Sequence, residues 1–168
     1  VKPYKAQIGS IPTESLVGLI FLLFFKFICE KFVQDLTSAG SSDTDSFMEE
    51  LKELAKGDDR ILFTGFVQGA MLDELYSNAY IYTLPSDLEG MPLSLLEAMS
   101  YGNCCLVSDI PECAEVVEDK ALIFKKSDVE DLREKLQDAC DHPEMVMRMK
   151  NQAADFICKK YNWDEVVK

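Results

Sequence analysis

From residue 40 onward, the pattern of apolar and polar positions predicts strands that alternate with helices. Short apolar runs are typical of buried strands, and we expect strands at residues 61–64, 80–84, 104–107 and 121–124. Between them, apolar residues recur every three or four positions, which is typical of helices. The expected helices cover residues 44–55, 71–79, 92–101, 113–117, 129–140 and 144–161. This alternation predicts an α/β fold, a doubly wound Rossmann-like parallel sheet with helices on both faces.

Before residue 40 the pattern is less regular. Residues 1–15 hold two prolines and a glycine, so we expect an irregular lead-in there, followed by a single domain over residues 16–168. Residues 16–25 are strongly apolar. A buried parallel strand has this pattern, and so does a buried helix, because periodicity does not separate the two in a short run. The run is shorter than the ~20 residues that cross a bilayer.

The stretch from Pro85 to Gly102 combines a polar loop with a helix. It follows the apolar run at residues 80–84, its helix opens near a proline, and Gly102 is suited to end that helix. Glu89 lies in the loop, and Glu97 follows eight residues later in the helix. In an open α/β sheet, ligands bind beyond the carboxyl ends of the strands, so this loop is the candidate site.

The chemistry of this loop suits a sugar nucleotide. The backbone N–H groups of Met91, Leu93 and Ser94 lie near the helix N-terminus without an intrahelical partner, and with the helix dipole they favour an anionic group. The carboxylates of Glu89 and Glu97 accept hydrogen bonds, which suits hydroxyl groups. Taken singly, the two glutamates also fit a simpler interpretation, as solvated charges on a loop and a helix.

The same loop and helix closely resemble the E-x7-E signature of retaining glycosyltransferases with the GT-B fold, in the string EGMPLSLLEAMSYG that begins at Glu89. The resemblance is to the large family known as glycosyl transferases group 1. It implies that Glu89 contacts the donor sugar and is the candidate catalytic residue, and that Glu97 contacts the ribose. Gly90, Met91 and Leu93 are expected to line the donor site beside them.

The resemblance continues from about Gly40 to the last residue and covers the C-terminal, donor-binding half of the GT-B fold. Gly65 and Phe66 stand where the family's backbone meets the nucleotide base. Glu115 matches a family glutamate that precedes an apolar pair. Trp163 matches an aromatic residue of the closing helix, and we interpret it as an apolar anchor for that helix.

Two lysines are candidates for the donor pyrophosphate. Lys26 and Lys31 stand where the resemblance places an Arg and a Lys, although Phe25 and Phe32 replace the family's glycines and Lys lacks the bidentate fork of Arg. Ordinary surface lysines are the alternative. The segment between Lys31 and residue 40 is about a dozen residues shorter than the resemblance implies, so one βα element is shortened, rearranged or wrongly recorded.

Charge and cysteine content narrow the classes of function. The formal net charge of −13 argues against nucleic-acid binding, which needs a basic surface, and requires local positive charge for an anionic ligand. The six cysteines show no CxxC spacing and sit in apolar or helical segments, so we expect reduced, buried thiols in a cytoplasmic protein. No metal site, cofactor, signal peptide or internal repeat is predicted. His142 is expected to be a surface residue between two helices.

The leading interpretation is that the chain is one domain of an enzyme. The resemblance implies the donor-binding domain of a retaining glycosyltransferase, which transfers a hexose from a nucleoside diphosphate sugar to an acceptor. Its partner is then an N-terminal acceptor-binding domain that the sequence lacks. That domain would also provide any peripheral contact with a membrane. The alternative is a nucleotide-sugar-binding or interaction module that has lost catalysis. A dinucleotide-dependent dehydrogenase is disfavoured, because no G-x-G-x-x-G follows a strand.

Overall fold

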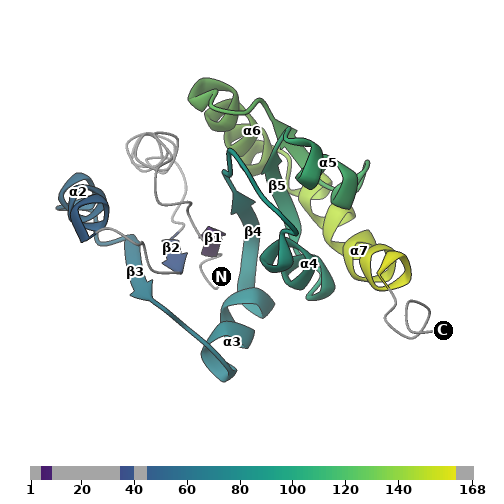
Figure 1. Cartoon of the computed structure of the whole chain (residues 1–168), viewed down its shortest axis with the longest axis horizontal. Coiled ribbons are helices and arrows are strands. Elements are labelled where there is room, and N and C mark those ends of the chain that lie inside the picture. Colours follow the sequence, from purple (N-terminus) through teal and green to yellow (C-terminus); the bar gives the residue numbers. More distant parts are fainter. Residues whose placement is uncertain (1–4, 9–34, 40–44, 162–168) are drawn as a thin grey trace.

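The computed structural model of the chain describes residues 5–8, 35–39 and 45–161, with the side chains of residues 48–161 (Figure 1). The strands are β1 (Lys5–Ile8), β2 (Asp35–Ala39), β3 (Ile61–Gly65), β4 (Ala79–Leu84), β5 (Cys104–Ser108) and β6 (Leu122–Phe124). The helices in this part of the chain are α2 (Asp45–Ala55), α3 (Ala70–Asn78), α4 (Leu93–Ser100), α5 (Pro111–Val117), α6 (Val129–Asp141) and α7 (Pro143–Lys160).

The six strands form one parallel sheet in the order β3-β2-β1-β4-β5-β6. After β1 the chain adds β2 and β3 on one side, and it then returns to add β4, β5 and β6 on the other. This is the strand order of Rossmann domains, in which the ligand crevice opens at the carboxyl ends of the strands beside that reversal. Here the reversal lies between β1 and β4, and β4 leads directly into the loop that carries Glu89.

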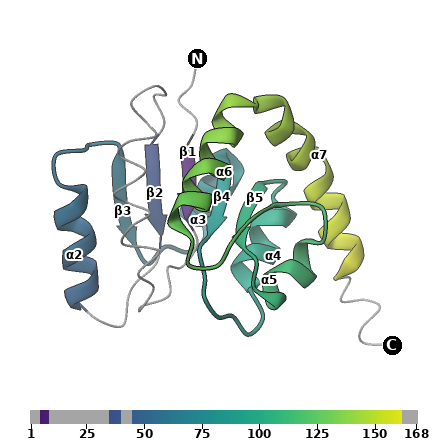
Figure 2. The same ribbon diagram turned by 90° about the horizontal axis from the view of Figure 1, so that it is seen from above.

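Helices cover both faces of the sheet (Figure 2). The buried side chains of β5 alternate between the faces: Cys104 and Leu106 belong to the apolar cluster that includes α6, and Cys105 and Val107 to the cluster that includes α4 and α5. Helix α7 contributes its first half to one cluster and its second half to the other. Each Leu or Val that is fully buried in this way stabilises the fold by about 1.5–3 kcal/mol.

The structure confirms the fold class and the elements expected after residue 40. All four strands and six helices predicted there are present, and their bounds differ from the expectation by at most two residues. Strong periodicity and clear turn residues at each boundary explain this agreement.

The prediction of an irregular lead-in is wrong for residues 5–8. These residues form β1, which pairs with β2 on one side and with β4 on the other. The strand is only four residues long and lies between Pro3 and Gly9, so its local pattern is that of a turn, and its partners are distant in sequence. Residues 16–25, Lys26 and Lys31 lie outside the described residues. Strand β2 ends at Ala39, so the short segment between Lys31 and residue 40 does contain a strand.

Glycines follow two of the helices, and Gly102 ends its helix as predicted. Gly57 (φ 83°) follows α2 and Gly102 (φ 73°) follows α4. At the end of α4, the N–H of Gly102 donates to the carbonyl of Met99 and the N–H of Asn103 donates to the carbonyl of Ala98. The turn therefore needs a left-handed residue at Gly102, where glycine carries no steric penalty.

Among the residues that the structure describes, no helix has the length and apolar character to cross a membrane.

A substitution at Gly102 should therefore destabilise the fold through its backbone conformation. We expect Gly102→Ala to lower the free energy of unfolding by about 1–2 kcal/mol, the cost of a left-handed alanine. A Cβ there meets only the carbonyl oxygen of Lys150 at 3.6 Å, an ordinary contact, so overpacking does not add to the loss. Gly90→Ala is the control, because Gly90 has no positive φ and no atom within 4 Å of its added Cβ. Equal stability of both variants in urea unfolding would contradict the argument.

Candidate functional site

Three loops at the carboxyl edge of the sheet are tied to one another. The Ser108 hydroxyl, at the end of β5, donates to the carbonyl of Ser86 in the loop after β4. The Ser127 hydroxyl, in the loop after β6, donates to Asp87 Oδ1 at 3.0 Å. The backbone N–H of Lys126 donates to Asp109 Oδ1 at 2.7 Å. These bonds hold the candidate loop against its neighbours and give it a defined shape.

The two predicted glutamates lie on this loop and on the helix that follows it. Glu89 is half-buried in the loop, and Glu97 is exposed in the second turn of α4. No hydrogen bond or ion pair of Glu89 is found within the described part of the chain. Its carboxylate is close enough to the Cys113 thiol to help burial raise the pKa of that thiol to about 12. Glu89 is therefore available to a ligand, while Glu97 accepts one internal bond.

The amino end of α4 offers fewer free amides than the sequence predicted. The N–H of Leu93 donates to the carbonyl of Met91 at 2.8 Å, so the expectation of an unpaired amide there is wrong. The tight turn at Pro92, the residue before the helix, brings these two groups together. The N–H groups of Met91 and Ser94 have no hydrogen-bond partner among the described residues. Two amide donors and the helix dipole remain for an anion.

Two buried tyrosines form hydrogen bonds with side chains of α4. The hydroxyl of Tyr82, on β4, donates to Ser94 Oγ at 2.9 Å. The hydroxyl of Tyr76, on α3, lies 3.2 Å from Glu97 Oε2. The two ring centroids are 6.0 Å apart. Burial raises the pKa of both hydroxyls well above the ordinary value for tyrosine, so both stay protonated and donate at neutral pH.

Exposed apolar side chains lie in the loops at the carboxyl edge of the sheet. Phe66, which follows β3, is 70 % exposed, and Leu88, in the candidate loop, is 77 % exposed. Met91 and Leu93 are also exposed. Gly65 has a φ of 67°, so the chain turns sharply just before Phe66. Three strand spacings separate β3 from β4, about 14 Å across the sheet. The predicted base-contacting and sugar-contacting residues thus share the carboxyl edge but lie at different points along it.

Two lysines at this edge were not singled out from the sequence. Lys125 and Lys126 directly follow β6 and are exposed, and their ammonium groups make no ion pair with a described residue. They are the basic residues that the described loops place at the carboxyl ends of β3 to β6. Their position after an apolar strand was the signal that could have identified them.

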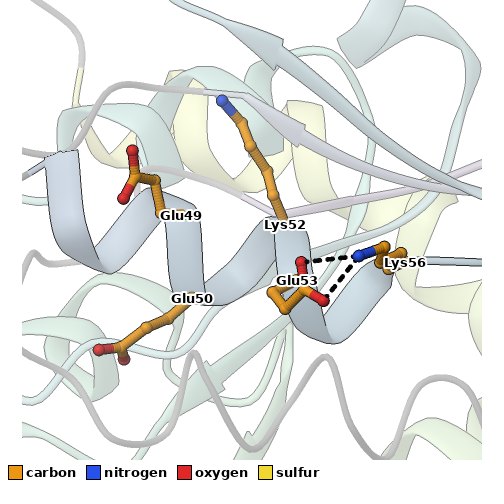
Figure 3. A pocket seen from close by; sticks show the side chains of 5 residues that line it. All are labelled: Glu49, Glu50, Lys52, Glu53 and Lys56. Carbon is orange, nitrogen blue, oxygen red and sulfur yellow. Dashed lines mark hydrogen bonds and ion pairs between the residues drawn. The ribbon is translucent and has the colours of Figure 1, made fainter.

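Two hollows on the surface differ in character. The larger, about 770 Å³, runs along α2 and is lined by Glu49, Glu50, Lys52, Glu53 and Lys56. Figure 3 shows that these side chains come from one helix and its end, with Glu53 and Lys56 joined by an ion pair of 2.9 Å. The described side chains that line it are all charged and lie along an exposed helix flank, unlike the mostly apolar and aromatic lining of a ligand pocket. The smaller, about 210 Å³, lies between α4 and α7 and includes Glu97, Leu96 and Tyr161.

The five described cysteines and the histidine differ in burial and in pKa. Burial raises the pKa of Cys104 to about 12 and of Cys140 to about 11. Cys158 is exposed, so the expectation of buried thiols is wrong there, because its helical position faces solvent. His142 is exposed between α6 and α7, as predicted, and Asp138 raises its pKa. No group of metal-binding side chains is found among the described residues.

The fold and the site define an α/β domain of the Rossmann type with a ligand edge beside β4. Residues 23–156 match the family described as glycosyl transferases group 1, and the chain belongs to this family. It is similar to the sulfoquinovosyl transferase SQD2 of Arabidopsis thaliana, with 30 % identity in an alignment over 167 residues that covers 96 % of this chain and 31 % of that protein. An uncharacterized glycosyltransferase, MJ1607 of Methanocaldococcus jannaschii, is 32 % identical over 91 residues, which are 54 % of this chain and 23 % of that protein.

Solved structures show the same fold. A sucrose-phosphate synthase from Thermosynechococcus elongatus gives a TM-score of 0.80 at 20 % identity over 98 % of this chain and 43 % of its own. HepE of Anabaena, in complex with UDP and glucose, gives 0.78 at 14 % identity over 94 % of this chain and 44 % of its own. The chain spans 23 % and 31 % of the two curated relatives named above.

The thiols offer a test of the described packing. At pH 8 we expect iodoacetamide to label Cys158 rapidly, whereas Cys104 and Cys113 stay unlabelled, since raised pKa values leave little thiolate and burial blocks access. Peptide mass spectrometry measures the label at each cysteine, and the same reaction in urea is the control in which all sites should react. Rapid native labelling of Cys104 or Cys113 would show that the core around β5 and α5 is open.

Proposed function

We propose that this chain is the donor-binding domain of a retaining glycosyltransferase, which acts on a hexose carried by a nucleoside diphosphate. The observation that carries the proposal is the position of Glu89 and Glu97 on either side of the free amino end of α4, at the carboxyl edge of a Rossmann-type sheet. Membership of the glycosyltransferase family supports a transferase. The complex of a structural neighbour with UDP and glucose supports a sugar nucleotide as ligand.

Each group has a proposed role in the reaction. The amides of Met91 and Ser94 and the dipole of α4 bind the pyrophosphate and stabilise the charge that builds on it as it leaves. Lys26 and Lys31 remain proposed contacts of the same group. Glu89 accepts hydrogen bonds from the sugar, and its carboxylate lies near the carbon that becomes positive as the glycosidic bond breaks. Glu97 accepts hydrogen bonds from the ribose, and Gly65 and Phe66 contact the base.

The two glutamates should be separable by ligand. Glu97→Ala should weaken binding of the free nucleoside diphosphate and of the intact sugar nucleotide. Glu89→Ala should weaken only the sugar nucleotide, because the free diphosphate has no sugar to contact. A hydrogen bond to a charged group is worth roughly 1.5–3 kcal/mol, which sets the expected loss for each bond. Isothermal titration calorimetry with both ligands measures the difference.

Glu134→Ala is the matched control for this pair, because Glu134 is an exposed glutamate on α6, away from the site. It should leave both affinities unchanged. If Glu89→Ala and Glu97→Ala weaken both ligands to the same degree, the assignment of separate sugar and ribose contacts is wrong.

We further expect that this chain alone binds the donor but does not transfer the sugar. The described residues form one Rossmann-type domain, and a GT-B enzyme brings its two substrates together between two such domains. Positioning two reactants can lower a barrier by ~7–11 kcal/mol, and a domain that holds only the donor forfeits most of this. The measurement is product formation from labelled sugar nucleotides with a panel of acceptors. Transfer at about 1 per second or faster, an ordinary enzyme rate, would refute this division of labour.

A further inference from the structure

Tyr76 connects α3 to the predicted ribose-binding residue. Its hydroxyl lies 3.2 Å from Glu97 Oε2 and 3.4 Å from the backbone carbonyl of Ser94. A phenol has one proton, and a carboxylate is the stronger acceptor of the two. The Tyr76 hydroxyl therefore donates chiefly to Glu97.

The phenol of Tyr76 is held in place from several sides. Its ring stacks on Tyr101, with centroids 5.3 Å apart and planes at 26°, and packs beside the ring of Tyr82. Its backbone carbonyl accepts a hydrogen bond of 2.9 Å from the side-chain amide of Asn103, which also donates to the carbonyl of Ala98 at 3.1 Å. Tyr76 and Asn103 are both buried. The phenol oxygen therefore cannot shift without disturbing the contact between α3 and α4.

Glu97 lacks such support of its own. Its side chain is exposed on α4, and an exposed glutamate samples several rotamers that a ligand must restrict on binding. The bond from Tyr76 engages Oε2, and no donor to Oε1 is found in the described part of the chain. A fixed carboxylate with one open oxygen is a prepared acceptor for hydroxyl groups.

We propose that Tyr76 is a positioning residue of the donor site, which fixes the Glu97 carboxylate so that its free oxygen accepts hydrogen bonds from the vicinal hydroxyls of a ribose. This inference rests on the proposed function, because it assumes a nucleotide at Glu97. The neutral phenol orients the carboxylate without cancelling its charge. Tyr76 itself does not contact the nucleotide.

The test is Tyr76→Phe, which retains the ring and its stacking and removes only the hydroxyl. Calorimetry is carried out with UDP, GDP and ADP, and the nucleotide that the wild-type chain binds most tightly is then compared with its 2′,3′-dideoxy counterpart. We expect Tyr76→Phe to weaken binding of the nucleoside diphosphate by about 3- to 10-fold, as for the loss of a single hydrogen bond. Binding of the dideoxy compound should not change, because it has no hydroxyls for Glu97.

Tyr101→Phe is the matched control. It removes a phenol hydroxyl from the same aromatic cluster, but that hydroxyl donates to Asp73 Oδ1 at 2.5 Å and not to Glu97. Both nucleotides should bind this variant as they bind the wild-type chain. Thermal unfolding of each variant separates a loss of folded protein from a loss of affinity.

A second measurement uses the double variant. In the Glu97→Ala background, Tyr76→Phe should cause no further loss of affinity, because the carboxylate that it positions is gone. Additive losses, or equal losses for the two nucleotides, would overturn the role of Tyr76 while leaving the proposed function intact. So would an unchanged affinity in Tyr76→Phe. A wild-type chain that binds none of the three diphosphates would instead overturn the proposed function, and this role with it.

Discussion

The fold and the site both depend on the pairing of β4 between β1 and β5. All six residues of β4 are buried, and its start is held by the ammonium group of Lys150, which donates to the carbonyl of Ala79 at 2.5 Å. Its register with β5 is regular from Ile81 to Leu84. The loop with Glu89 begins directly after Leu84, so the position of that loop follows from the register of the strand. A shift by one residue would turn every side chain of β4 to the opposite face.

Helix α4 is held in position by contacts with the sheet and with α3, as well as by the loop that precedes it. Leu95, Ala98 and Met99 are fully buried against the sheet, so the opposite side of the helix, with Glu97, faces solvent. Tyr82 reaches α4 from β4, and Tyr76 reaches it from α3. One short helix thus carries an exposed carboxylate and is contacted by two buried tyrosines from neighbouring elements. This combination distinguishes Glu97 from an ordinary surface glutamate, which the sequence alone could not do.

The sequence was informative where structure is determined locally. Apolar periodicity and turn residues predicted every element after residue 40, and Gly102 was correctly placed as a helix end. It was wrong where distant partners decide the outcome. Residues 5–8 form a strand because β2 and β4 lie beside them, and the amide of Leu93 is paired because Pro92 closes a tight turn. The exposure of Cys158 depends on which side of α7 meets the core.

Carboxylates at the carboxyl edge of the sheet fall into two groups, and this division bears on how an acidic chain could present the proposed anion site. Asp87, Asp109 and Asp131 each accept a hydrogen bond from the loop after β6, which offsets part of their charge and fixes the loops. Glu89 accepts none within the described residues and remains available. The amides of α4 lie at the positive end of the helix dipole, which supplies local positive charge for a phosphate. Under the proposed function, the net charge of −13 repels a diphosphate at long range, and the site attracts it only at contact. Binding then depends on the exact placement of a few donors, and hence on the contacts that hold α4 against β4 and α3.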